Sequence, residues 1–423
     1  MFETLQFLFF AVWALLVPIP NSALYSEDLR LLLYNYRPHA IAGAVFAFGL
    51  AYYALSRFWN RPAPPANRLV HPVLQLAFVF PFYFLLLQAT RVDTEPAMAV
   101  FYFLWAGCSF YVAQNYSASR ERLKRMCLLL AAAFALNLLV CWALAVQQGK
   151  LAPILKDRIS IGYENPHFAA MVGQGLVITC LAWFLARQAS GGARDLRVYL
   201  LVGVCVAGSV LLAYLARARG TLGFYIAAAV FFWILRRSER SKLFLPLLAY
   251  TVLASVAFTA FLEREQVGRL DTIASGRLSF WSLYVDYLTE KENPILEGVF
   301  GFQEVPQSTL GSYDSLGKQK RFSTLHFDNI YLEMMVKGGA VGVLFFFGPY
   351  LLILYLGLNN LHLAGKNRNL AAWLLAVLLA TLVHGSVVTT MPTFNNPVGF
   401  LTALLSISSI GIVHEGMRER ARE

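Results

Sequence analysis

Runs of about twenty apolar residues recur along this chain, and no other feature constrains its fold as strongly. A helix of that length spans a bilayer, where every backbone polar group must be satisfied internally. The composition agrees, since 58% of the residues are apolar and only 14% are charged. We therefore predict an all-α, polytopic membrane protein with about twelve transmembrane helices. These cover 5–20, 39–56, 72–90, 97–114, 126–147, 167–186, 198–215, 222–235, 243–262, 329–358, 370–390 and 397–414.

Basic residues set the expected orientation of these helices. They concentrate in alternate connecting segments, such as 120–125 and 236–242, and this bias predicts that those segments and both termini are cytoplasmic. The first apolar run, 5–20, lacks a basic start and a small-residue cleavage site, so we expect it to remain as a helix. The predicted division is transmembrane helices in 1–262, a large loop on the opposite side in 263–328, and three further helices with a cytoplasmic tail in 329–423.

The loop 263–328 is predicted to contain structure of its own. Trp281, Tyr284 and Leu288 recur at helical spacing within 277–288, which favours a helix lying at the membrane interface. The stretch 303–323 is rich in Ser, Gly and Gln, and we expect it to be mobile, as a lid would be.

Arginines gather on the side of the membrane opposite the basic cytoplasmic segments. Arg158 precedes one helix, Arg217 and Arg219 occupy a short turn between two helices, and Arg277 opens the interfacial helix. A guanidinium binds phosphate oxygens bidentately, and a helix start adds N–H donors. The pattern favours a diphosphate site at headgroup level. Contact with lipid headgroups is the alternative reading of each single arginine.

His326 is the one histidine in the loop 263–328. Its ordinary pKa of about 6.5 suits a general base. Asn329 and Glu333 share its helical face and are candidates to orient it or a substrate, although Glu333 could instead pair with Lys337 four residues on. The other histidines show no shared ligand spacing: His39, His71, His167, His362, His384 and His414.

Several kinds of chemistry lack their sequence signatures. The chain has no D-x-D, Walker A, H-E-x-x-H or G-x-S-x-G motif, so nucleotide-dependent and serine-nucleophile chemistry are not supported. Its five cysteines lie in or beside apolar runs without metal-ligand spacing, as buried apolar side chains do. We predict neither a metal nor another cofactor.

Four stretches together resemble the O-antigen ligase family, whose membrane-embedded glycosyltransferases are related to O-antigen polymerases and bacterial O-oligosaccharyltransferases. The first stretch, Arg158 to Ala170, resembles the family's Arg…Gly…Asn-Pro-x-x-x-Ala segment, and the second, Arg219-Gly220-Thr221, resembles its Ser-Arg-Gly turn. The third stretch runs from Gly276-Arg277 through Trp281 to Asn293-Pro294 and Gly298, and it resembles the family's Gly-Arg-x-x-x-Trp…Asn-Pro-x-x-Gly pattern. The fourth, His326…Asn329-x-Tyr331-Leu332…Gly338-Gly339…Gly342, resembles its His…Asn-x-Tyr-Leu…Gly-x-x-Gly run. Two departures leave choices open. Ala218 replaces the usual serine, so either Arg217 or Arg219 is the phosphate contact, and Phe327-Asp328 separates His326 from Asn329.

The resemblance implies a ligase of lipopolysaccharide biosynthesis in the bacterial inner membrane, with its active site at the periplasmic face. Such an enzyme transfers O-antigen glycan from undecaprenyl diphosphate to the lipid A-core oligosaccharide without a metal, inverting the anomeric centre. The implied catalytic residues are His326 as base with Arg277 and Arg219 on the diphosphate. The implied substrate-binding residues are Arg158, Arg217, Asn329, Tyr331 and Glu333.

Other functions are compatible with the same residues. An O-antigen polymerase or a protein O-oligosaccharyltransferase would use the same donor site. A lipid-linked glycan transporter is the alternative from another class, although it predicts charges along a central path rather than at one face. Nucleic acid is not an expected partner, because the formal charge of +11 fits the positive-inside bias and contact with anionic lipids.

Overall fold

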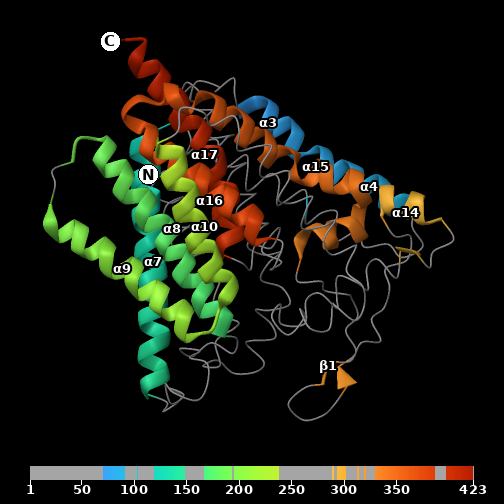
Figure 1. Ribbon diagram of the computed structural model, residues 1–423, viewed down its shortest axis with the longest axis horizontal. Helices are drawn as coiled ribbons and strands as arrows, with labels where there is room; N and C mark the ends of the chain where they lie inside the picture. Colours follow the sequence, from blue (N-terminus) through green and yellow to red (C-terminus); the bar gives the residue numbers. More distant parts are fainter. Residues whose placement is uncertain are drawn as a thin grey trace, which may run out of the picture.

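The computed structural model describes a bundle of helices (Figure 1). The described residues are 70–90, 102, 119–147, 166–192, 195–237, 288–289, 293–301, 312–313, 319–320, 329–385 and 397–422. The main helices are α3 (Val70–Ala77), α4 (Val79–Thr90), α7 (Arg120–Gln147), α8 (Pro166–Ala189), α9 (Leu196–Leu215), α10 (Arg219–Arg237), α14 (Pro294–Phe300), α15 (Ile330–Asn360), α16 (Arg368–His384) and α17 (Pro397–Arg420). Two 3-10 turns, η4 (Leu361–Leu363) and η5 (Gly365–Asn367), join α15 to α16.

Six helices in this part of the chain are long and apolar enough to cross a membrane, which indicates a membrane protein. They lie over six of the predicted spans, those from 126–147 to 222–235 and the two at 329–358 and 370–390. The predicted span 397–414 is also helical, as α17. The predicted helices 5–20, 39–56, 97–114 and 243–262 lie outside the described residues, apart from Tyr102.

Helix α16 forms the centre of the bundle and packs against α10, α17, α8 and α15 (Figure 1). Every residue from Leu370 to Leu382 is buried. Polar groups inside the bundle are paired across helices: the Trp373 indole N–H donates to the Ile178 carbonyl at 3.2 Å, and the Thr381 and Thr402 hydroxyls lie 2.9 Å apart. By contrast, most of α9 is exposed apolar surface, as a lipid-facing helix would be.

Two predicted helices are broken in the structure. The predicted span 72–90 is divided at Phe78 into α3 and α4. Helix α15 is interrupted at Gly339, whose φ of 64° and ψ of −166° are not helical. The rings of Tyr331 and Phe347 stack at 4.7 Å, whereas sixteen residues of straight helix would separate them by about 24 Å. The short first part of α15, 330–338, therefore folds back along the longer second part, 340–360.

The stretch that was predicted to be mobile, 303–323, contains a small antiparallel ladder. Strand β1 (Ser312–Tyr313) pairs with β2 (Gln319–Lys320), with Ser312 opposite Lys320. The interfacial helix predicted over 277–288 lies outside the described residues except for its last position, Leu288, which is helical.

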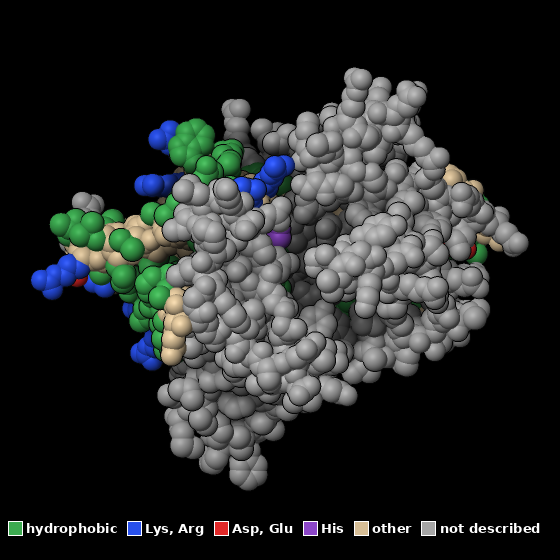
Figure 2. Space-filling view, turned by 90° about the horizontal axis from the view of Figure 1, so that it is seen from below, with side chains coloured by type: hydrophobic (Ala, Val, Ile, Leu, Met, Phe, Trp, Pro, Cys, Tyr) green, Lys and Arg blue, Asp and Glu red, His purple; other side chains and the backbone are tan. Residues whose placement is uncertain are grey.

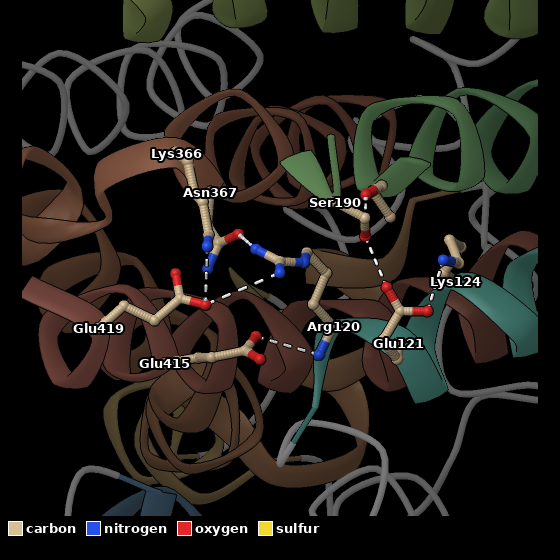
Figure 3. A network of polar contacts seen from close by, with 9 residues as sticks. Arg120, Glu121, Lys124, Ser190, Lys366, Asn367, Glu415 and Glu419 are labelled. Carbon is tan, nitrogen blue, oxygen red and sulfur yellow. Dashed lines mark hydrogen bonds and ion pairs between the residues drawn. The ribbon is translucent and has the colours of Figure 1, made fainter. Parts of the chain in front are cut away.

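A polar network joins the helix termini at one end of the bundle, which we call the Arg120 end (Figure 3). The Arg120 guanidinium donates to the Asn367 side-chain oxygen at 2.5 Å and lies 3.7 Å from Glu419, which also pairs with Lys366 at 3.2 Å. The Arg120 backbone N–H donates to the Glu415 carboxylate at 3.0 Å. Burial raises the pKa of Glu415, and this hydrogen bond partly offsets the rise. The network ties the start of α7 to the end of α17 and to η5.

Replacing Arg120 with alanine should lower the free energy of unfolding by about 2–3 kcal/mol, because it removes a charged donor to the buried Asn367 side chain and the partner of the partly exposed Glu419. The matched control is Lys124→Ala, which removes a partly exposed pair with Glu121 and should cost at most about 1 kcal/mol. Unfolding of both variants in detergent checks the difference. Equal losses would contradict a special role for Arg120.

Candidate functional site

The predicted site residues that the structure describes lie at the end of the bundle opposite the network, which we call the Asn329 end. Helices α8, α10 and α15 begin there, and α9 and α16 end there, because α16 runs back from η5. The Ile330 backbone N–H donates to the Gly385 carbonyl at 3.0 Å, so the start of α15 meets the end of α16. In the view from this end, one histidine side chain is visible, and a basic side chain lies above it (Figure 2).

The turn between α9 and α10 exposes two arginines. Arg217 and Arg219 are both exposed, whereas Ala216 and Ala218 are buried. Arg217 has a φ of 53°, a left-handed conformation that costs energy in a residue other than glycine and that often marks a functional site. Successive side chains of this turn therefore alternate between the interior and the surface, and both arginine side chains are at the surface.

Four alanines hold this turn against its neighbours. This alanine cluster consists of Ala170, Ala213, Ala216 and Ala218. Ala218 is only 1% exposed, so a small apolar side chain fits where the resembling family usually has serine. Because Ala170 comes from the start of α8, the cluster also brings the end of the first resembling stretch, 158–170, to the second stretch at the arginine turn.

The start of α15 is fixed by its own predicted site residues. The Asn329 side-chain oxygen accepts hydrogen bonds from the backbone N–H groups of Tyr331 and Leu332, as an N-cap does. The Tyr331 hydroxyl donates to the Leu382 carbonyl at 2.6 Å. Glu333 is buried one turn further on. The observed contacts of Asn329 and Tyr331 thus position the helix start, and their binding of substrate stays a prediction.

His384 links the arginine-bearing helix to this helix start. It is the last residue of α16 and is 3% exposed, and its ring lies 5.9 Å from that of Phe224 on α10. The next residue, Gly385, accepts the hydrogen bond from Ile330. Sequence reasoning did not select His384, because it shares no ligand spacing with the other histidines. The histidine-glycine pair at the end of an apolar run was the available signal.

The third and fourth stretches that resemble the O-antigen ligase family also lie in contact. Helix α14, which begins within the Asn-Pro stretch, packs against the break in α15. A Cβ atom at Gly339 would lie 2.2 Å from the Val299 carbonyl oxygen, so glycine is required by this close approach. The Tyr83 hydroxyl donates to the Gly338 carbonyl at 2.7 Å and satisfies a group that the break exposes.

Three predicted site residues, Arg158, Arg277 and His326, lie outside the described residues. His326 stands three residues before Asn329 in the sequence. Within the described ranges, no group of three His, Cys, Asp or Glu side chains is placed to hold a metal ion.

No protein-family model and no curated protein matches this chain. The fold and the described site define a helical membrane protein with exposed arginines, a capped helix start and a buried histidine at one end.

Proposed function

We propose that the protein is an O-antigen ligase, which transfers a glycan from undecaprenyl diphosphate to the lipid A-core oligosaccharide. In this proposal the Asn329 end faces the periplasm and the Arg120 end faces the cytoplasm, in a bacterial inner membrane. The observation that carries the proposal is the end of α16, where His384 contacts α10 and Gly385 binds the start of α15. It connects the exposed arginine turn to the segment that follows His326.

The chemistry follows from the residue types. Arginines at the turn hold the diphosphate and stabilise its growing charge as the glycosidic bond breaks. A sugar hydroxyl of the acceptor attacks the anomeric carbon, and His326 accepts the hydroxyl proton. A diphosphate leaves readily, so this direct displacement inverts the anomeric centre and calls for neither a general acid nor a metal.

The test is transfer in detergent with purified protein, undecaprenyl-diphosphate glycan as donor and lipid A-core as acceptor, with and without EDTA. Glycan on lipid A-core in both conditions supports the ligase. Longer glycan chains on the carrier lipid would favour the polymerase. No transfer by folded protein would overturn the enzyme proposal and direct the work to transport assays.

Replacing Arg219 with lysine should lower the transfer rate about tenfold to a hundredfold, because lysine keeps the charge but loses the bidentate fork. Lysine keeps the positive charge at this exposed position, so the melting temperature should change little. The matched control is Arg197→Lys on exposed α9 surface near its cytoplasmic start, which should transfer normally. Initial rates at saturating acceptor measure the effect. If Arg217→Lys is impaired and Arg219→Lys is not, Arg217 is the phosphate contact.

A further inference from the structure

Tyr225 lies on α10, the helix that begins at the arginine turn. It is six residues beyond Arg219, a rise of about 9 Å along the helix. Helical side chains lean toward the start of their own helix, so this ring projects back toward the turn. The packing agrees, because Tyr225 contacts the alanine cluster that includes the turn residues Ala216 and Ala218.

The Tyr225 hydroxyl is a shielded polar group with no hydrogen-bond partner among the described residues. A buried hydroxyl that lacks a partner costs about 1–3 kcal/mol, and a bound group that accepted its hydrogen bond would remove this cost. The neighbouring Phe224 ring lies 6.1 Å from the Tyr225 ring and contacts His384 at the end of α16, so Tyr225 is adjacent in sequence to the residue that joins α10 to α16.

We propose that the Tyr225 hydroxyl donates a hydrogen bond to a phosphate oxygen of the lipid-linked diphosphate, beside the guanidinium of the arginine turn. This inference rests on the proposed function and assigns its donor site a further residue. A phenol is neutral, so it adds a donor without adding charge. Its shielding from water strengthens the bond, since electrostatic interactions grow as the local dielectric falls.

The experiment compares wild type with Tyr225→Phe, which removes only one oxygen atom. Undecaprenyl diphosphate in detergent is the probe, and both its affinity and the rise in melting temperature that it causes are measured. Tyr225→Phe should bind about tenfold to a hundredfold more weakly, the effect of one hydrogen bond to a charged group. The control, Tyr355→Phe on the exposed side of α15, should bind like wild type.

Two further arms identify the ligand. For inorganic pyrophosphate, the affinity of wild type should exceed that of Tyr225→Phe by the same factor as for undecaprenyl diphosphate. Phosphatidylglycerol should bind to both proteins with equal affinity. Equal binding of undecaprenyl diphosphate by wild type and Tyr225→Phe overturns this inference, while transfer by wild type leaves the proposed function intact. A ratio of the same size for phosphatidylglycerol also overturns it, because Tyr225 would then bind an ordinary headgroup. If wild type neither binds the probe nor transfers glycan, the proposed function fails as well.

Discussion

Replacing Gly339 with alanine should destabilise the protein by about 4 kcal/mol or more, because two costs add at this position. The φ of 64° and ψ of −166° lie in a region that is essentially restricted to glycine, and strain there costs about 1–3 kcal/mol. The new Cβ would also lie 2.2 Å from the Val299 carbonyl oxygen, which belongs to the backbone and cannot rotate away. The contact of α14 with the break in α15 would have to open.

Unfolding in detergent, together with the yield of monodisperse protein, checks this prediction. The matched control is Gly203→Ala on α9, where a Cβ meets nothing within 4 Å. Alanine at an exposed helical position favours the helix by up to about 1 kcal/mol, so this variant should be as stable as wild type or more so. If the melting temperature of Gly339→Ala equals that of wild type, the fold-back of α15 is not required for stability.

Replacing His326 with alanine should lower glycan transfer by about a hundredfold to ten-thousandfold, the usual contribution of a general base. The hydrogen bonds that fix the first residues of α15 support so large an effect. Asn329 caps the helix and Ile330 binds Gly385, so the start of α15, which follows His326 in the sequence, is held in place. A base attached to a fixed helix start can be presented to an acceptor hydroxyl with constant geometry.

The control for this variant is His362→Ala, which removes an exposed histidine in η4 and should transfer at the wild-type rate. Donor affinity should be unchanged in His326→Ala, because the base acts on the acceptor and the arginines bind the diphosphate. A variant that transfers at a third of the wild-type rate or faster would remove His326 from the mechanism. A variant that instead loses donor binding would place His326 in the donor site.

Within the described residues, the positions of the long helices were predictable from the sequence. The predicted spans 126–147, 167–186, 198–215 and 222–235 each lie inside a helix that extends by a few residues at one or both ends. Apolar length is a local property, and in a membrane the helix is the one open-chain structure that satisfies its own backbone, so local composition suffices. The arginine turn was located for the same reason, since it is what remains between two such spans.

The breaks in the helices were not predictable in this way. Phe78 and Gly339 lie inside runs that are apolar enough to read as continuous helix. Gly339 breaks α15 because α14 approaches it and Tyr83 binds the freed Gly338 carbonyl, and both partners come from distant parts of the chain. A glycine permits such a break, but only its neighbours require it.

The sequence by itself therefore determined the helical membrane class, most span positions in the described chain and the residue types of the candidate site. Only the tertiary structure decided that the end of α16 joins the arginine helix to the start of α15 through His384 and Gly385, that Tyr225 packs on the alanine cluster, and that Asn329 is a cap. The length of an apolar run is read directly from the sequence, and its effect on helix formation depends on neighbouring residues alone. These contacts join residues that are far apart in sequence and depend on how helices pack, which no local pattern encodes.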